Sequence, residues 1–94
     1  MIKHIVLFQF KDPEECIPTV MEKLHSMEAV IPEIRSMETG KDILHSKRSY
    51  DMALIVTVDS RDDLEIYDKH PYHQEVRKYI HEHRTASVAC DFEF

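Results

Sequence analysis

Three stretches of the chain have the two-residue alternation of a β-strand, in which successive side chains point to opposite faces of a sheet. Residues 2–10 and 50–58 are rich in β-branched and aromatic residues and carry apolar side chains in both registers. One face of the first stretch holds Ile2, His4, Val6, Phe8 and Phe10, and the other holds Ile5 and Leu7. Because it is apolar on both faces, we expect this strand in the middle of a sheet. Residues 86–94 form a last strand with Val88, Cys90, Phe92 and Phe94 on one face.

A weaker strand pattern covers residues 34–44. Its apolar members are Met37, Ile43 and Leu44. Gly40 lies inside this stretch and predicts a bulge or a bend, because glycine weakens a regular strand. The polar residues 45–49 follow and predict a turn into the strand that starts at residue 50.

Apolar residues spaced by three and four positions predict a first helix between the first two strands. Its start is marked by Asp12, which can cap the helix, and by Pro13, which fits the first turn. The apolar positions are Ile17, Val20, Met21, Leu24 and Met27. The helix should end near Ala29, because Pro32 blocks its continuation.

Two shorter helices are predicted between the third and fourth strands. Ser60 and Asp63 have the spacing of a helix cap, and Leu64 and Tyr67 should then face inward. Pro71 interrupts this helix and can open a second one. The apolar side of the second helix would carry Tyr72, Val76, Tyr79, Ile80 and His83.

The predicted order is β-α-β-β-α-β, the ferredoxin-like pattern of an α+β domain. Right-handed crossovers then place the helices on one face of a four-stranded antiparallel sheet. The opposite face has no cover within the chain, although two strands carry apolar side chains there. A large exposed apolar patch usually marks an interface, and a two-fold operation is the commonest way to bury a repeated patch. We therefore expect a homodimer in which two sheets face each other.

The composition limits the classes of function. A chain of 94 residues is one domain, residues 1–94. Its net charge of −6 argues against a nucleic-acid partner, which requires a concentrated basic surface. The chain has a single glycine, which argues against nucleotide-binding proteins, because phosphate-binding loops and dinucleotide-binding motifs need several glycines. No apolar run approaches the ~20 residues of a membrane span, so we expect a cytoplasmic protein without a membrane partner.

The candidate chemistry lies in the segment Tyr67-Asp68-Lys69-His70-Pro71-Tyr72-His73, which gathers two tyrosines and two histidines around a proline. A histidine can take a proton from a hydroxyl or from a carbon beside a carbonyl group at neutral pH. A tyrosine hydroxyl can orient a carbonyl oxygen or stabilise an enolate. Tyr67 ends one helix and His73 begins the next, so the break at Pro71 can point both at one cleft. His4, a polar residue on an apolar strand face, is a third candidate.

Two other interpretations of this segment stay open. In the first, the residues form a structural helix junction, and Tyr67 and His73 bond only to the backbone. In the second, His70 and His73 are a metal-binding pair. Such a site needs at least one further ligand, for which Asp68, His81 or His83 could be proposed, although nothing in the spacing demands them. We therefore assign no metal site. The remaining histidines are in polar surroundings and should face solvent: His25, His45, His81 and His83.

In combination, several motifs resemble the stress-responsive dimeric α/β-barrel family, also called Dabb. They are His4-Ile5-Val6-Leu7-Phe8-Gln9-Phe10-Lys11, Ile31-Pro32-Glu33-Ile34, Gly40-Lys41-Asp42, Tyr50-Asp51-Met52-Ala53-Leu54, Asp63-Leu64-Glu65-Ile66-Tyr67 and Asp91-Phe92-Glu93. The most specific match is the Tyr-x-x-His-Pro-x-His pattern of residues 67–73. The matching pieces span nearly the whole chain.

The resemblance implies a ferredoxin-like protomer whose homodimer closes two sheets into an α/β barrel. Most members of the family have no assigned reaction, and plant members are associated with stress responses. One plant member is a polyketide cyclase, which closes a linear polyketide by aldol condensation without a cofactor. By motif, the resemblance implies that His73 is the general base and that Tyr67 holds the carbonyl group. It also implies that His4 lines the pocket, and His70 is a further substrate-binding candidate.

The function predicted from the sequence is thus a small-molecule pocket, for a small hydrophobic ligand, with acid/base chemistry of the aldol type and no cofactor. This chain departs from the cyclase at Met52, where the cyclase has another pocket histidine, and from the family at Glu33, where glycine is usual. The alternatives are a non-catalytic stress-response or structural dimer and, by analogy of fold alone, a cofactor-free monooxygenase.

Overall fold

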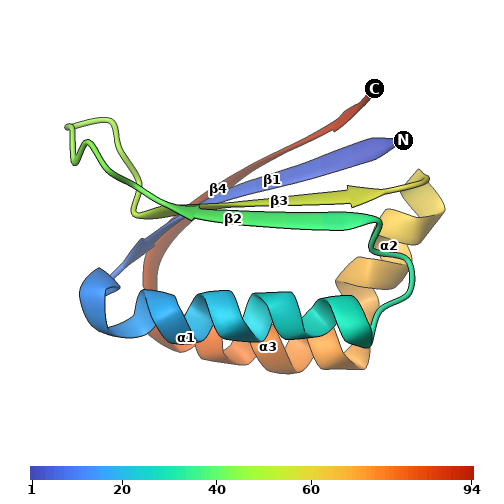
Figure 1. The fold of residues 1–94 in the computed structure, drawn as a ribbon, viewed down its shortest axis with the longest axis horizontal. Helices are drawn as coiled ribbons and strands as arrows, with labels where there is room; N and C mark the ends of the chain where they lie inside the picture. Colours follow the sequence, from blue (N-terminus) through green and yellow to red (C-terminus); the bar gives the residue numbers. More distant parts are fainter.

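The computed structural model describes all 94 residues, and it confirms the predicted order of strands and helices (Figure 1). The strands are β1 (Ile2–Phe10), β2 (Ser36–Lys41), β3 (Met52–Val58) and β4 (Arg84–Glu93). The helices are α1 (Pro13–Ser26), α2 (Arg61–Lys69) and α3 (Pro71–His83), and a 3₁₀ turn, η1 (Met27–Ala29), continues α1. The first helical segment therefore ends where the sequence predicts.

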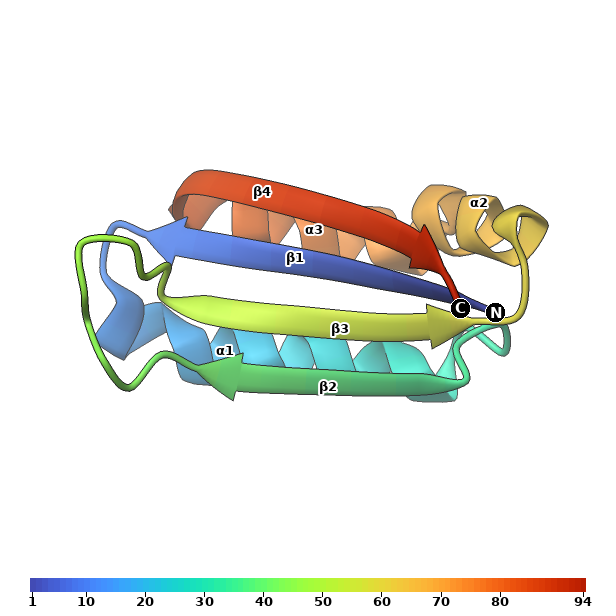
Figure 2. The same ribbon diagram turned by 90° about the horizontal axis from the view of Figure 1, so that it is seen from above.

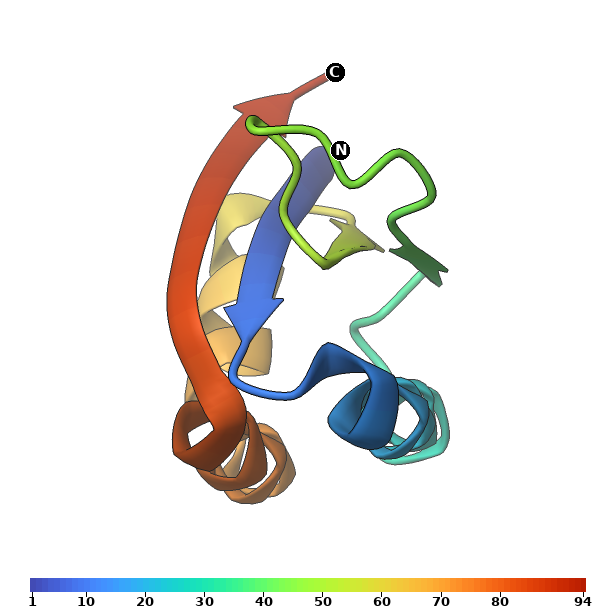
Figure 3. The same ribbon diagram turned by 90° about the vertical axis from the view of Figure 1, so that its left-hand side faces the viewer.

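The four strands form one antiparallel sheet in the order β2-β3-β1-β4 (Figure 2). As predicted for its double-sided pattern, β1 lies inside the sheet, between β3 and β4. Figure 3, an end-on view, shows α1 and α3 side by side beneath the sheet and no helix on the other face. This is the ferredoxin-like architecture.

The face of the sheet toward the helices forms the core of the domain. Seventeen buried apolar residues make one cluster, which the sheet and helices share. Alternate residues of the strands contribute to it, such as Phe8 of β1 and Leu54 and Val56 of β3. Cys16 and Val20 contribute from α1. Burial of this side-chain set, at roughly 25 cal/mol per Å² of apolar area, is the main stabilising contribution.

The other face of the sheet is apolar and uncovered. In the strand register, Ile5 pairs with Ile55 and Cys90, and Leu7 pairs with Ala53 and Val88. We call this set, with Phe92 and Phe94, the open-face patch. Its exposed large side chains are Leu7, Val88, Phe92 and Phe94. The structure confirms that the helices leave this apolar face without cover.

The predicted strand 34–44 is too long, because β2 ends at Lys41. Ile43 and Leu44 lie in the following loop and are 85% and 78% exposed. Asp42 ends the strand: its Oδ2 accepts a hydrogen bond from the His45 backbone N–H at 2.7 Å, and His45 adopts a left-handed φ of 52°. Such local hydrogen bonds from the backbone to a side chain compete with the sheet for backbone groups.

Three smaller predictions differ from the structure in detail. Gly40 pairs with Ala53 in an unbroken register, so it marks no bulge, and the register shift lies instead between Gln9 and Phe10. The predicted strand from residue 50 begins at residue 52. Asp12 occupies the N-cap position of α1, but its side chain makes no capping hydrogen bond.

Candidate functional site

The junction between α2 and α3 positions the candidate residues. The predicted cap of α2 is confirmed, since Ser60 Oγ accepts a hydrogen bond from the Asp63 N–H at 3.1 Å. His70 separates the two helices and caps the second, because its Nδ1 accepts a hydrogen bond from the Tyr72 N–H at 3.1 Å. Pro71 occupies the first turn of α3, where no backbone N–H is needed. The chain therefore turns sharply between Tyr67 and His73, as the sequence predicts.

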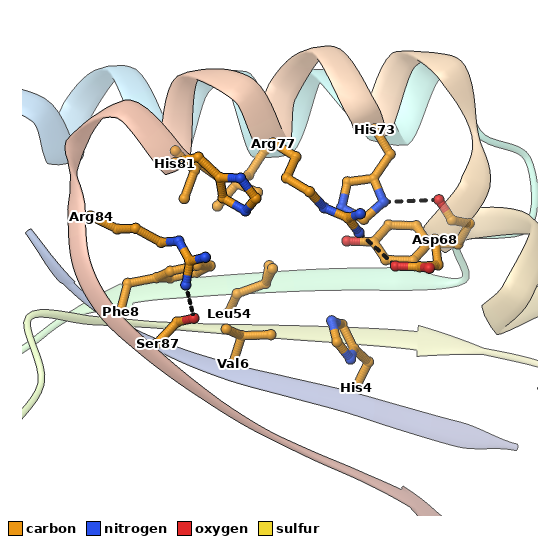
Figure 4. Close-up of a pocket in the computed structure, with 13 residues that line it drawn as sticks. His4, Val6, Phe8, Leu54, Asp68, His73, Arg77, His81, Arg84 and Ser87 are labelled. Carbon is orange, nitrogen blue, oxygen red and sulfur yellow. Dashed lines mark hydrogen bonds and ion pairs between the residues drawn. The ribbon is translucent and has the colours of Figure 1, made fainter.

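Three of the four predicted site residues line one cavity of about 190 Å³ between the sheet and the helices. His4 comes from β1, Tyr67 from the end of α2, and His73 from the start of α3. Figure 4 shows His73 above the cavity and His4 rising toward it from the sheet. Residues separated by up to 69 positions in the sequence are thus brought to one site. We call this space the central cavity.

His73 is held by one hydrogen bond in a defined state. Its ring is buried, at 8% exposure, and its Nδ1 lies 2.9 Å from the Tyr67 carbonyl oxygen. A carbonyl oxygen can only accept, so Nδ1 carries the proton and Nε2 keeps its lone pair when the ring is neutral. Burial lowers the pKa of His73, and the nearby Arg77 guanidinium lowers it further. His73 is therefore neutral at pH 7, with a free basic nitrogen.

Tyr67 supplies an unpaired hydroxyl beside this base. The side chain is 1% exposed and its ring stacks on His73, with the ring centroids 4.3 Å apart. The Tyr67 hydroxyl is buried and has no hydrogen-bond partner in the protein. Burial raises the pKa of Tyr67 well above its ordinary value, so the hydroxyl stays protonated. A buried polar group without a partner is rare, and here it is a donor available to a ligand.

His4 completes the group from the sheet side. Its ring meets the edge of the Tyr67 ring at a centroid distance of 5.9 Å. The Asp91 carboxylate of β4 accepts a hydrogen bond from His4 Nδ1, which fixes the orientation of the imidazole. Met52, the residue by which this chain departs from the cyclase, is buried in the core and does not line the cavity.

The structure does not bring His70 to the central cavity. His70 lies in a surface groove with Ile66 and Lys69, and its Nδ1 is used for the cap of α3. His70 and His73 therefore face different surroundings. The chain assembles no group of three His, Cys, Asp or Glu side chains that could hold a metal ion.

From the sequence alone, no place in the pocket was assigned to a set of charged and polar residues that line the cavity wall: Asp68, Arg77, His81, Arg84 and Ser87. Arg77 forms an ion pair with Asp68 at 2.5 Å, close to His73. Arg84 donates a hydrogen bond to Ser87 Oγ. His81, expected to face solvent, is exposed but also lines the cavity. For Arg77 and His81, helical spacing was the available signal, because positions 73, 77, 80 and 81 follow one face of α3.

His4, Tyr67 and Asp68 also line a second, more open hollow of about 280 Å³ on the α2 side. None of the helices is both long enough and apolar enough to cross a membrane.

A four-stranded antiparallel sheet in the order β2-β3-β1-β4, with all helices on one face, defines a ferredoxin-like domain. Residues 2–94 match the family described as the Stress responsive A/B Barrel Domain, or Dabb. The chain belongs to this family, as the motifs in its sequence predict. No curated protein matches the sequence.

Solved structures share the fold over nearly the whole chain. A dimeric ferredoxin-like protein of unknown function from Bacteroides fragilis is 28% identical, with a TM-score of 0.88 over 99% of this chain and 95% of that one. A dimeric ferredoxin-like protein of unknown function from Thermobifida fusca is also 28% identical, with a TM-score of 0.87 over 99% and 90% of the two chains. The hydroxynitrile lyase from Passiflora edulis is 18% identical, with a TM-score of 0.86 over 97% and 90%. At that identity, the likeness to the lyase is one of fold alone.

Proposed function

We propose that the protein is a homodimeric, cofactor-independent enzyme of the cyclase or lyase type, which makes or breaks a carbon–carbon bond beside a carbonyl group. The observation that carries this proposal is the pairing of a neutral, buried His73 with the unpaired hydroxyl of Tyr67 at one cavity. A base and a hydrogen-bond donor at one site are the minimum that enolate chemistry requires.

Each group has a role in the condensation direction. His73 Nε2 takes a proton from the carbon beside the substrate carbonyl, and the C–H electron pair forms the enolate. The Tyr67 hydroxyl donates a hydrogen bond to the enolate oxygen and stabilises its charge. The enolate carbon then bonds to a second carbonyl carbon, and the resulting alkoxide takes the proton from His73 Nε2. The base is regenerated and no other reactant is consumed.

The open-face patch supports the homodimer. It is a contiguous apolar surface on one side of the sheet, and the helices leave it uncovered. The similar proteins from Bacteroides fragilis and Thermobifida fusca are described as dimeric. We infer that two copies of this chain pack their open faces together, which closes two sheets into the barrel of the family.

The cleavage of diacetone alcohol into two molecules of acetone tests the proposed chemistry in the reverse direction. His73 Nε2 would take the hydroxyl proton, the carbon–carbon bond would break, and the enolate held by Tyr67 would be protonated to acetone. His73→Asn keeps a donor for the Tyr67 carbonyl but removes the base, and should lower kcat/KM on the order of 10²–10⁴-fold. Tyr67→Phe removes the donor and should lower kcat on the order of 10²–10³-fold. The measurement is acetone formation followed by NMR.

His25→Asn is the matched control, because His25 is a half-exposed histidine of α1 that does not line the central cavity. Its rate should equal that of the unsubstituted protein. The wild-type rate should rise with pH as His73 loses its proton, and its midpoint should lie below the ordinary histidine value of about 6.5, since the pKa of His73 is lowered. Equal rates for the wild type and His73→Asn would refute the proposal.

A non-catalytic structural dimer is the second candidate. It is favoured by one observation, that the His73 ring is held by a hydrogen bond to a backbone group, the Tyr67 carbonyl oxygen. That interpretation predicts a cavity filled by side chains, whereas about 190 Å³ is open. It also predicts that His73→Ala lowers stability without affecting the binding of any small ketone, which a titration with acetone would measure.

A further inference from the structure

The central cavity has polar groups at two ends. Figure 4 shows His4, Asp68 and His73 at one end and Arg84 and Ser87 at the other. Between the two ends, Val6 and Leu54 form an apolar floor. The acid/base groups of the proposed function occupy only the first end. The second end, which we call the Arg84 end, has no role in that chemistry.

The two arginines of the cavity wall differ in how their charges are balanced. Arg77 is paired with the Asp68 carboxylate at 2.5 Å. Arg84 makes no ion pair, and its side chain donates only to the neutral Ser87 hydroxyl. Arg84 is nevertheless half-buried. A charge that is partly removed from water and lacks a counter-ion is unfavourable unless something else balances it.

The electrostatic environment of His81 agrees with this imbalance. Partial desolvation at the cavity wall lowers the pKa of His81, and the positive charges of Arg84 and then Arg77 lower it further. The Arg84 end is thus locally positive in a chain whose net charge is −6. A positive group at the wall of a cavity in an acidic protein favours an anionic ligand.

We propose that the ligand of the central cavity is a small oxo acid, whose carboxylate binds to Arg84 while its carbonyl group lies beside Tyr67 and His73. The carbonyl half of this inference rests on the proposed function, and the carboxylate half rests on Arg84. A guanidinium presents N–H groups in a planar fork that matches a carboxylate, and only one of them is directed at Ser87. The apolar floor then contacts the carbon chain between the two groups.

The cavity volume limits the size of this acid. An engineered cavity of about 150 Å³ holds benzene, which has six non-hydrogen atoms. A cavity of about 190 Å³ therefore suits a ligand of roughly six to ten non-hydrogen atoms. Levulinate, or 4-oxopentanoate, falls in this range, and 2-hexanone is a neutral ketone of similar size.

The test is an NMR titration of the isotope-labelled protein with levulinate and, separately, with 2-hexanone. Arg84→Gln should weaken levulinate binding roughly ten- to a hundredfold, the usual contribution of a charge-assisted hydrogen bond. The affinity of the same variant for 2-hexanone should stay within about twofold of the wild-type value. Arg84→Lys should recover part of the levulinate affinity. Arg48→Gln removes an equal charge from the exposed β2–β3 loop and should change neither affinity.

Three results would overturn the inference. The first is that Arg84→Gln loses affinity for levulinate and for 2-hexanone equally, and the second is that its affinity for levulinate is unchanged. The third is that the protein binds inorganic phosphate more tightly than levulinate. A thermal melt of Arg84→Gln establishes that the variant is folded. The two proposals fail separately. If levulinate binding depends on Arg84 but diacetone alcohol is not cleaved, the proposed enzymatic activity is refuted and the anion site stands. If cleavage depends on His73 but levulinate binding does not depend on Arg84, the anion site is refuted and the proposed activity stands.

Discussion

The two faces of the sheet are made of alternate residues of the same four strands, yet they end in different surroundings. On β3, Val56 points toward the helices and has 0% exposure, whereas the preceding Ile55 points away and is only half-buried. Both residues are β-branched and apolar. The burial of each residue therefore depends on whether the helices cover its face of the sheet and not on its own hydrophobicity. The uncovered face is available for a partner.

The covered face is not uniformly packed. Val6, Phe8 and Leu54 belong to it, but they also line the central cavity. The helices thus leave open space above these residues, from the α2–α3 junction with Tyr67 and His73 to the end of α3 with Arg84. The two faces therefore have separate uses: the covered face holds the candidate chemistry, and the open face holds the inferred interface.

The largest expected effect comes from placing a charge on the covered face. Val56→Asp buries a carboxylate among apolar side chains without a partner. We expect the chain not to fold, because an unpaired buried charge destabilises by several kcal/mol and a small domain has only about 5–15 kcal/mol to lose. Circular dichroism and a urea titration would measure this. A cooperative transition close to that of the wild type would contradict the assignment of this face.

The same substitution one residue earlier should act on assembly instead. Ile55→Asp places its charge in the open-face patch, where the single chain leaves it in contact with water. We expect a folded monomer, with dimerisation weakened by roughly 3–5 kcal/mol, or a factor of about 10²–10⁴ in the dissociation constant. Sedimentation velocity would show a shift toward the 11.2 kDa of the single chain. An unchanged dimer would place the interface elsewhere.

A smaller effect is expected at the start of α2, which carries Tyr67 on the covered side. Ser60→Ala removes the side-chain oxygen that accepts the Asp63 N–H. The free energy of unfolding should fall by about 1 kcal/mol, the usual value for a lost N-cap, and the dimer should persist. Chemical denaturation of the dimer at fixed concentration would measure it. No change in stability would mean that this cap does not hold α2.

Most of the fold could be predicted because periodicity and caps are local properties of the sequence. The double-sided pattern of β1 placed it inside the sheet, and Ser60 and Pro71 marked the helix starts correctly. The exception is the stretch after Lys41, where the apolar pair Ile43 and Leu44 suggested a longer strand. The two are adjacent and so cannot share one face of a strand, and the hydrogen bond from the His45 N–H to the Asp42 side chain turns the chain away from the sheet.

The candidate site was predictable only in part. Tyr67 and His73 are six positions apart across a helix break, so local reasoning could bring them together. Arg84 could not be found in this way, because its position in the cavity depends on how β4 leaves α3 and returns along β1. His70 illustrates the opposite case, in which a motif residue lies outside the cavity and serves as a cap.

The most direct test of the proposed chemistry is the titration of the His73 ring by heteronuclear NMR, with His73→Asn used to assign its signals. We predict a neutral ring with its proton on Nδ1 and a midpoint below about pH 6.5, because burial disfavours the charged form. A midpoint at or above that value, or a neutral ring with its proton on Nε2, would contradict it.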